Sequence, residues 1–142
     1  MKIAIIGSGF FGSSLAIRLS KNKKFSVTLF EKEKKILLNL LKKNQMRFHL
    51  GYHYPRSSKT VNEIKKSNKD FIKYYGKSIF GKTDNYYSIA KTKSRTSFKK
   101  YKNFLLKNNL KFKQIVNSNF FSKNIEGSFI TNEKNLNYKK IY

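Results

Sequence analysis

The fold is decided at the start of the chain, where residues 2–12 read Lys-Ile-Ala-Ile-Ile-Gly-Ser-Gly-Phe-Phe-Gly. The nearly continuous apolar run at 2–6 is typical of a strand that is buried on both faces of a parallel sheet. Apolar residues at helical spacing then predict a helix over 10–20, and the β-branched and aromatic run at 25–30 predicts a second strand. The fold class is therefore α/β, and it begins with a right-handed βαβ unit.

The turn between this strand and helix carries a Gly-x-Gly-x-x-Gly pattern, which consists of Gly7, Ser8, Gly9, Phe10, Phe11 and Gly12. We expect Gly7 to permit the tight turn, Gly9 to let a pyrophosphate approach the backbone, and Gly12 to let the helix pack close to the strand. The helix N-terminus offers N–H groups and a partial positive charge to phosphates. These six residues are therefore predicted to bind a dinucleotide.

Glu31 ends the second strand, 19 residues after Gly12. A carboxylate at this place accepts hydrogen bonds from the hydroxyls of an adenosine ribose and repels a 2′-phosphate, which argues against NADP. Lys32, beside it, is included among the candidate cofactor-binding residues. The loop by itself does not distinguish FAD from NAD.

The chain has 142 residues and a net charge of +25. Of its 32 basic residues 28 are Lys and 4 are Arg, and they are spread along the chain together with many Asn, Ile, Phe and Tyr. A biased base composition explains this set, because all of these residues have A/T-rich codons. A selected surface for polyanions stays open as the alternative, although no specific nucleic-acid partner is expected.

Several classes are excluded by what the sequence lacks. There is no Cys, which excludes disulfides, thiolate catalysis and Cys-based zinc sites. No apolar run is long enough to span a membrane, and the apolar stretch before Gly7 is too short for a secretory signal, so a cytoplasmic protein is expected.

The rest of the chain reads as further alternating helices and strands. Helices are predicted over 32–43, over 15–20 residues from Ser57 or Ser58, and over 97–108; strands or extended segments are predicted over 48–54, 85–90, 112–116 and 127–130. We expect residues 1–58 to be the N-terminal part of a Rossmann-like dinucleotide-binding domain, and 59–142 to begin an α+β substrate domain.

Residues 44–58 hold both His residues and two of the four Arg residues. In an extended chain His49, Gly51 and His53 share one face, where the glycine would let a planar group approach. His53 is the candidate proton carrier, and Arg47 and Arg56 are candidates for holding an anion. A metal site is not expected, because no Asp, Glu or Cys lies nearby to complete one.

This segment carries a resemblance to a known family. It resembles FAD-dependent oxidoreductases of the D-amino-acid oxidase-like superfamily, and most of all a bacterial subgroup with an Asn-Gln-x-Arg-x-His-x-Gly-x-His-Tyr-Pro-Arg-Ser segment. The matching positions are Asn44, Gln45, Arg47, His49, Gly51, His53, Tyr54, Pro55, Arg56 and Ser57. The stretches 84–90 and 126–133 also fit, so the resemblance covers nearly the whole chain.

The resemblance implies FAD as cofactor, with Asn44 and Gln45 added to the cofactor-binding residues. It implies hydride transfer to the flavin from a C–H bond beside an amine or hydroxyl of a small-molecule substrate. Because members of the family are usually more than twice as long, we expect the chain to be an N-terminal fragment. Without the strands that complete the sheet, FAD binding by the chain alone is expected to be weak or absent.

Two alternatives stay open. Gly51-Tyr52-His53 loosely resembles a segment of flavin-dependent nucleotide-sugar enzymes of the UDP-galactopyranose mutase type. The high positive charge leaves open a non-catalytic basic nucleic-acid-binding module as the other alternative.

Overall fold

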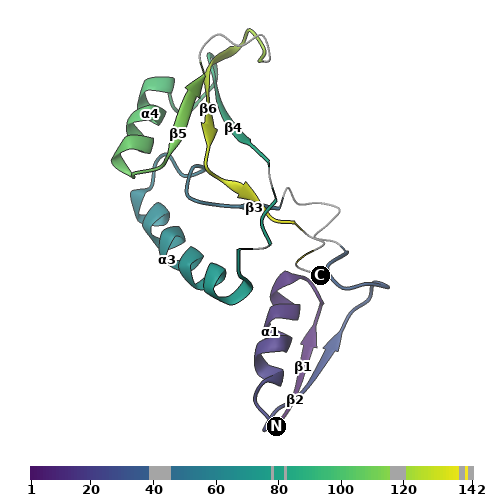
Figure 1. Cartoon of the computed structure of the whole chain (residues 1–142). Coiled ribbons are helices and arrows are strands. Elements are labelled where there is room, and N and C mark those ends of the chain that lie inside the picture. The colour runs from purple at the N-terminus through teal and green to yellow at the C-terminus, as the bar shows by residue number, and fades with distance from the viewer. Residues whose placement is uncertain (39–45, 78, 82, 116–120, 138–139, 141–142) are drawn as a thin grey trace. The chain divides into compact units, whose positions relative to one another are not determined.

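The computed structural model describes residues 1–38, 46–77, 79–81, 83–115, 121–137 and 140. The chain divides into two compact units, Met1–Gln45 and Met46–Ile141 (Figure 1). The expected division lay at residue 58. It falls earlier because residues after Gln45 already belong to the core of the second unit, where Tyr52 is buried. The assignment of a cofactor-binding part and a substrate part stays a prediction.

The first unit is a parallel pair of strands joined by one helix. Strand β1 (Lys2–Ile6) pairs with β2 (Ser26–Phe30) in parallel, in register along the whole length of both. Helix α1 (Phe10–Ser20) makes the crossover between them (Figure 1). The predicted βαβ unit is confirmed, with the second strand starting one residue later than expected.

Helix α1 covers one face of this sheet. Ile5 on that face is buried, and its Cγ2 lies 3.6 Å from the position that a Cβ of Gly12 would take in α1. On the other face Ile6 is 90% and Phe30 54% exposed. The prediction that the first strand is buried on both faces is therefore wrong for the described residues, since two strands and one helix provide a single covering layer.

The segment after β2 turns back toward the glycine loop. Residues 32–37 form bends and a turn, so the described part of the helix predicted over 32–43 is not helical before Leu38. The Leu37 N–H donates to the Ser8 carbonyl at 3.0 Å, and the Leu37 side chain is buried. This long-range bond replaces the local one that a helix would have made. Residues 39–43 lie outside the described residues.

The second unit contains a three-stranded antiparallel sheet. Its order is β4 (Asn85–Ala90), β6 (Ile125–Thr131) and β5 (Phe112–Ile115). A short antiparallel pair, β3 (Arg47–Phe48) with β7 (Lys134–Asn135), brings the start of this unit beside its end. The predicted strands at 85–90, 112–116 and 127–130 are confirmed over their described residues, and β6 is longer than expected.

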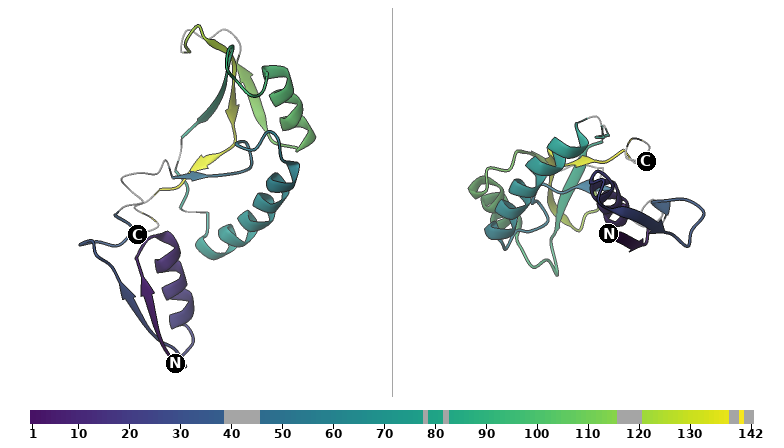
Figure 2. Two further views of the ribbon diagram at one scale, coloured as in Figure 1. Left: turned by 180° about the vertical axis from the view of Figure 1, so that it is seen from behind. Right: turned by 90° about the horizontal axis from the view of Figure 1, so that it is seen from below.

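Two amphipathic helices cover the same face of this sheet (Figure 2). Helix α3 (Ser58–Tyr75) is capped by Ser57, whose Oγ accepts the Thr60 N–H, and α4 (Phe98–Lys107) is capped in the same way by Ser97. Both predicted helices are confirmed. Their apolar residues meet the sheet in one core, formed by Tyr52, Val61, Ile89, Tyr101, Phe104, Leu105, Leu110 and Phe129.

The segment predicted to be extended over 48–54 turns instead. The strand ends at Phe48, and Gly51 has a φ of 107°, which breaks the alternation of faces. The Tyr54 N–H donates to the Gly51 carbonyl at 3.1 Å and closes the turn. A Cβ at Gly51 would meet Val61 at 2.9 Å, so the space that was expected to admit a planar group is filled by α3.

The helices that the structure describes include none with the length and apolar character needed to cross a bilayer.

Candidate functional site

The glycine loop of the first unit has the geometry that its sequence predicts. Gly7 has a φ of 95°, where glycine is favoured, and its N–H donates to the Phe30 carbonyl at 2.7 Å. A Cβ at Gly12 would lie 1.9 Å from the Gly7 carbonyl oxygen, so only glycine allows α1 to pack this close. Gly9 is the N-cap of α1, without a capping side chain, and a Cβ there would meet no atom within 4 Å.

The carboxylate of Glu31 points at this loop. Its Oε2 accepts both the N–H and the Oγ–H of Ser8, each at 2.6 Å, and its Oε1 accepts the Glu33 N–H at 3.0 Å. The hydrogen bond from the Ser8 hydroxyl, together with the backbone bonds, lowers the pKa of Glu31 from its usual 4.5 to about 2. The group is therefore a carboxylate at neutral pH, and it accepts bonds only.

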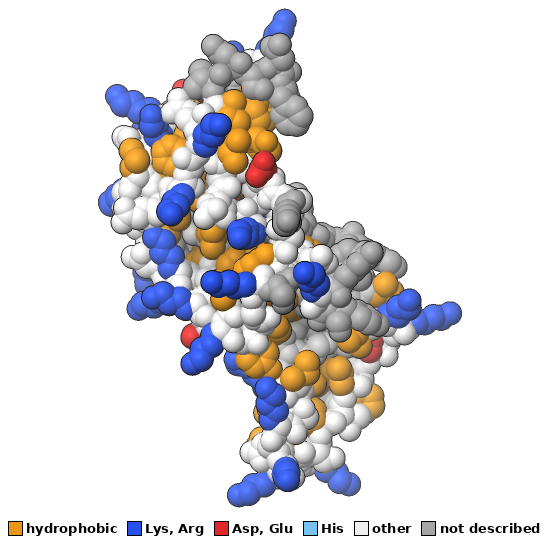
Figure 3. Space-filling model, in the orientation of Figure 1, with side chains coloured by type: hydrophobic (Ala, Val, Ile, Leu, Met, Phe, Trp, Pro, Cys, Tyr) orange, Lys and Arg blue, Asp and Glu red, His pale blue; other side chains and the backbone are white. Residues whose placement is uncertain are grey.

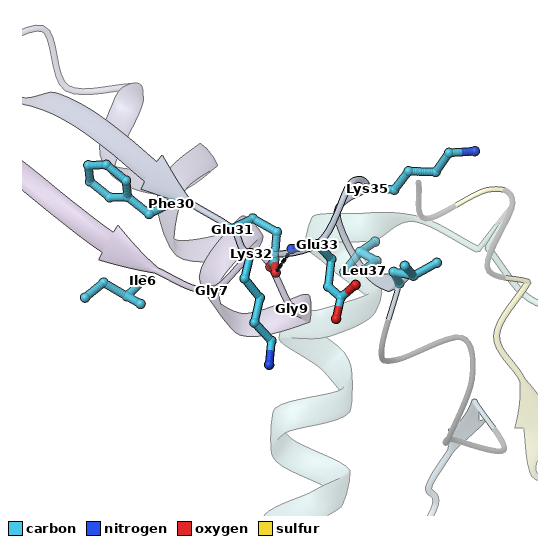
Figure 4. Close-up of a pocket in the computed structure, with 10 residues that line it drawn as sticks. Ile6, Gly7, Gly9, Phe30, Glu31, Lys32, Glu33, Lys35 and Leu37 are labelled. Atoms are coloured by element: carbon cyan, nitrogen blue, oxygen red, sulfur yellow. Dashed lines mark hydrogen bonds between the residues drawn. The ribbon is translucent and has the colours of Figure 1, made fainter.

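A cavity of about 590 Å³ opens at the carboxyl ends of β1 and β2 (Figure 4). Ligands of open α/β sheets bind at this end of the strands, beside the helix N-terminus. The lining combines apolar side chains with both signs of charge: Ile6, Gly7, Gly9, Phe30, Glu31, Lys32, Glu33, Lys35, Leu37 and Leu38. Its size suits a nucleotide.

Four of the predicted cofactor-binding residues line this cavity, namely Gly7, Gly9, Glu31 and Lys32. The other loop residues do not. Ser8 is fully buried and bonds Glu31, while Phe11 is 87% exposed and meets the edge of Phe10. Gly12 contributes to the shape of the loop by packing against the Gly7 carbonyl. Asn44 and Gln45 lie outside the described residues.

A second cluster of ionisable groups lies in the second unit around Glu133, whose side chain is completely buried. Oε1 of Glu133 accepts the Leu50 N–H at 3.0 Å and lies 3.4 Å from Nδ1 of His49. Oε2 accepts the Tyr87 hydroxyl at 2.5 Å and lies 4.0 Å from the Arg47 guanidinium. Arg47 also lies over the Tyr87 ring, 5.4 Å from its centroid.

His53 joins this cluster through Tyr87. Its Nδ1 is 3.1 Å from the Tyr87 hydroxyl, and its ring lies 5.4 Å from that of His49. Partial burial lowers the pKa of His53, and the interaction with His49 lowers it further. Glu133 acts in the opposite direction, and Arg47 lowers the pKa again. The net effect favours a neutral imidazole.

His53 also lines a pocket of about 280 Å³ with Tyr54, Pro55, Arg56, Ser57, Arg95 and Thr96. Two of the four Arg residues of the chain thus face one hollow. In the part of the second unit that the structure describes, neither Arg56 nor Arg95 forms an ion pair with a carboxylate. The pocket therefore combines an imidazole with positive charge, and it suits a small anion.

The sequence indicates Arg47 and His53 but not the groups that connect them, Tyr87 and Glu133. Tyr87 lies in the predicted strand 85–90 and Glu133 follows the predicted strand 127–130, and neither pattern marks these two residues as part of a site. The scarcity of acids could have indicated Glu133, because it is one of only seven Asp and Glu residues in the chain. Among the described residues, no three His, Asp or Glu side chains are placed to hold a metal ion.

The basic residues do not form a single patch on the face drawn in Figure 3, where Lys and Arg side chains are spread over both units. A nucleic-acid-binding surface usually gathers them on one face or along one helix. On this face (Figure 3) the distribution of Lys and Arg does not favour a nucleic-acid-binding surface.

Comparison with known proteins gives two matches. Residues 5–70 match the family described as NAD(P)-binding Rossmann-like domain. The chain is also 26% identical over 134 residues to the FAD-dependent monooxygenase FPY4 of Fusarium mangiferae. This alignment covers 94% of the chain but 36% of that relative, so the chain spans about a third of its length. No solved structure matches the chain.

Proposed function

We propose that the chain belongs to a flavin-dependent oxidoreductase and that its first unit binds the adenosine diphosphate part of FAD. One observation carries this proposal: the Glu31 carboxylate is held at the Ser8 amide, on the lip of a cavity of about 590 Å³ beside the glycine loop. The match of residues 5–70 to a Rossmann-like domain and the similarity to an FAD-dependent monooxygenase support it.

Different residues of the loop would bind different parts of the cofactor. The open space at Gly9 and the N-terminus of α1 would receive the pyrophosphate, while Glu31 would accept the hydroxyls of the ribose. Lys32, at the rim, adds positive charge beside the phosphates. The same carboxylate would repel the 2′-phosphate of NADP. Asn44 and Gln45 stay candidates for contacts with FAD.

The second unit would supply the substrate side, as in the D-amino-acid oxidase-like superfamily that the sequence resembles. A bound flavin would supply the acceptor for a hydride from a C–H bond beside an amine or hydroxyl. His53 would act on a proton of the substrate, and Arg47 and Arg56 would favour an anionic one. A small amine or hydroxy acid in a cytoplasmic setting is the substrate class that we propose.

Amide NMR of the isotope-labelled full chain tests the cofactor site, because it detects binding even in the millimolar range. ADP, FAD, NAD and NADP are titrated in separate samples. We expect ADP and FAD to shift the amide signals of Gly7, Ser8 and Gly9, and NADP to shift them least. Glu31→Gln should weaken the response to ADP, whereas Glu63→Gln, an exposed acid of the second unit, should leave it unchanged.

Loop signals that do not move at millimolar ADP would overturn the proposal. A response to NAD that exceeds the one to FAD would replace the flavin by a nicotinamide cofactor. A UDP-sugar serves as the last ligand, and a stronger response to it than to ADP would favour the nucleotide-sugar alternative.

A further inference from the structure

The buried carboxylate of Glu133 does more than pair with a cation. It lies in the turn between β6 and β7, and both of its oxygens accept hydrogen bonds, one from the Leu50 N–H and one from the Tyr87 hydroxyl. A buried carboxylate that accepts two donors is fixed in place. It therefore determines the direction in which the Tyr87 hydroxyl donates.

Tyr87 has a single hydroxyl proton, and that proton is donated to Glu133. Burial and the bond to Glu133 raise the pKa of Tyr87, so the hydroxyl keeps this proton. Toward any other neighbour the Tyr87 oxygen can act only as an acceptor. The neighbour at 3.1 Å is Nδ1 of His53, which must then be the nitrogen that carries a proton.

We propose that Tyr87 and Glu133 are positioning residues that hold His53 with its proton on Nδ1 and leave the lone pair of Nε2 as a proton acceptor. This inference rests on the proposed function for its chemistry. A proton leaving a substrate O–H or N–H would pass to Nε2 and make the ring an imidazolium. The negative charge of Glu133, relayed through Tyr87, would stabilise that cation.

The pocket that His53 lines indicates the kind of substrate. Arg56 and Arg95 both face it, and they carry positive charge that no described carboxylate of this unit pairs with. A small molecule with a carboxylate or other anionic group would be held there beside the imidazole. Arg95, which the sequence analysis did not single out, becomes a binding residue of this site.

The charges around His53 agree with a base that is neutral before it reacts. The groups that shift the pKa of His53 are His49 and Arg47, from the segment before it, and Glu133, from the β6–β7 turn. The other charged or titratable groups that face His53 are Tyr87 of β4 and the pocket residues Arg56 and Arg95. Partial burial, His49 and Arg47 lower the pKa of His53, and they outweigh Glu133, which raises it. A neutral ring with Nδ1 protonated is the form that accepts a proton at Nε2.

Nitrogen NMR of the histidine side chains tests this directly, without cofactor. The chain has only two His residues, and the signals of His53 are identified by their loss in His53→Gln. Free imidazole side chains in water favour the proton on Nε2. We expect the reverse for His53: Nδ1 resonates as a protonated nitrogen and Nε2 as an unprotonated one.

Tyr87→Phe removes the acceptor and should return His53 to a majority of the Nε2–H form. Tyr86→Phe is the matched control, because Tyr86 is the neighbouring tyrosine of β4, is 38% exposed and packs against Phe121. It should leave the spectrum of His53 unchanged. Lactate is the probe for the pocket: it should shift the His53 signals in the parent chain and shift them less in Arg95→Gln.

A majority of the Nε2–H form in the parent chain would overturn the proposal, and this outcome needs no variant to fold. An unchanged tautomer in Tyr87→Phe would overturn the role of Tyr87, and an absent lactate response would overturn the anionic substrate. None of these results depends on ADP or FAD. A glycine loop that fails to bind nucleotides would therefore overturn the proposed function and leave the inference about the His53 tautomer standing.

Discussion

Replacement of Glu133 by Ala is expected to destabilise the second unit more than any surface substitution. The change deprives two donors of their acceptor, the Leu50 N–H at 3.0 Å and the Tyr87 hydroxyl at 2.5 Å. Each unsatisfied buried donor costs about 1–3 kcal/mol, so the loss is expected to be about 2–6 kcal/mol. The Arg47 guanidinium also loses its carboxylate partner. A domain is stable by only about 5–15 kcal/mol, so the effect is large.

Urea unfolding of the full chain, followed by aromatic circular dichroism, measures this loss. The signal reports on the second unit, because Tyr52, Tyr87, Tyr101 and Phe129 pack in its core. Glu63→Ala is the matched control: it removes an exposed acid of α3 and should change the free energy of unfolding by no more than about 0.5 kcal/mol.

A loss below about 1 kcal/mol in Glu133→Ala, or one equal to that of Glu63→Ala, would refute the reasoning. It would mean that water reaches Leu50 and Tyr87 when the carboxylate is gone. The positioning role of Glu133 would then lose its physical basis, because a carboxylate that water can replace does not fix the Tyr87 hydroxyl.

Further outcomes are expected for Glu31, for the glycine loop and for His53. Stability of the first unit should fall as pH drops from 4.5 toward about 2, because Glu31 binds fewer protons in the native state than in the unfolded state. Amide hydrogen exchange across that pH range should show the loss of stability, and Glu31→Gln should abolish this pH dependence. Gly12→Ala should cost about 1–3 kcal/mol or more by urea unfolding, since its methyl would lie 1.9 Å from the Gly7 carbonyl oxygen. A Cβ at Gly9 would meet no atom within 4 Å, so Gly9→Ala should keep its stability and weaken the response to ADP. Equal losses of stability in Gly12→Ala and Gly9→Ala would contradict this. NMR titration of His53 should give a midpoint below 6.5, so stability of the second unit should rise with pH just below that value; a midpoint at or above 6.5 would contradict the assignment.

The local elements could be predicted because each has a cause within its own sequence. The serine caps at Ser57 and Ser97 and the apolar spacing that follows them predict α3 and α4, and the apolar run before Gly7 predicts β1. The glycine pattern predicts its own geometry, since Gly12 can pack on Gly7 only without a side chain. These predictions needed no knowledge of distant residues.

The second site could not be predicted, because distant contacts build it. Tyr87 and Glu133 are 46 positions apart, and they meet through the register of β4 against β6 and the turn that follows. The turn at Gly51 also depends on a distant contact. Alternation of polar and apolar residues predicts an extended segment, but the packing of Val61 against Gly51 favours a turn. Local pattern indicated which residue types were chemically capable, and only the tertiary structure shows how they are paired.

The bond between Glu31 and Ser8 has a consequence for binding that can be measured. A carboxylate offers about four acceptor positions, and Glu31 already uses at least three, two for Ser8 and one for Glu33. The two hydroxyls of a ribose therefore need at least one position more than is left. The Ser8 hydroxyl is the donor that can be released, because the backbone N–H groups are fixed by the chain. Ser8→Ala frees this position in advance and is expected to strengthen the response to ADP severalfold, whereas Ser20→Ala, whose hydroxyl bonds the Ile17 carbonyl on the exposed end of α1, should leave it unchanged. Weaker binding by Ser8→Ala would show that the serine hydroxyl serves the ligand itself and that Glu31 does not exchange it for the ribose.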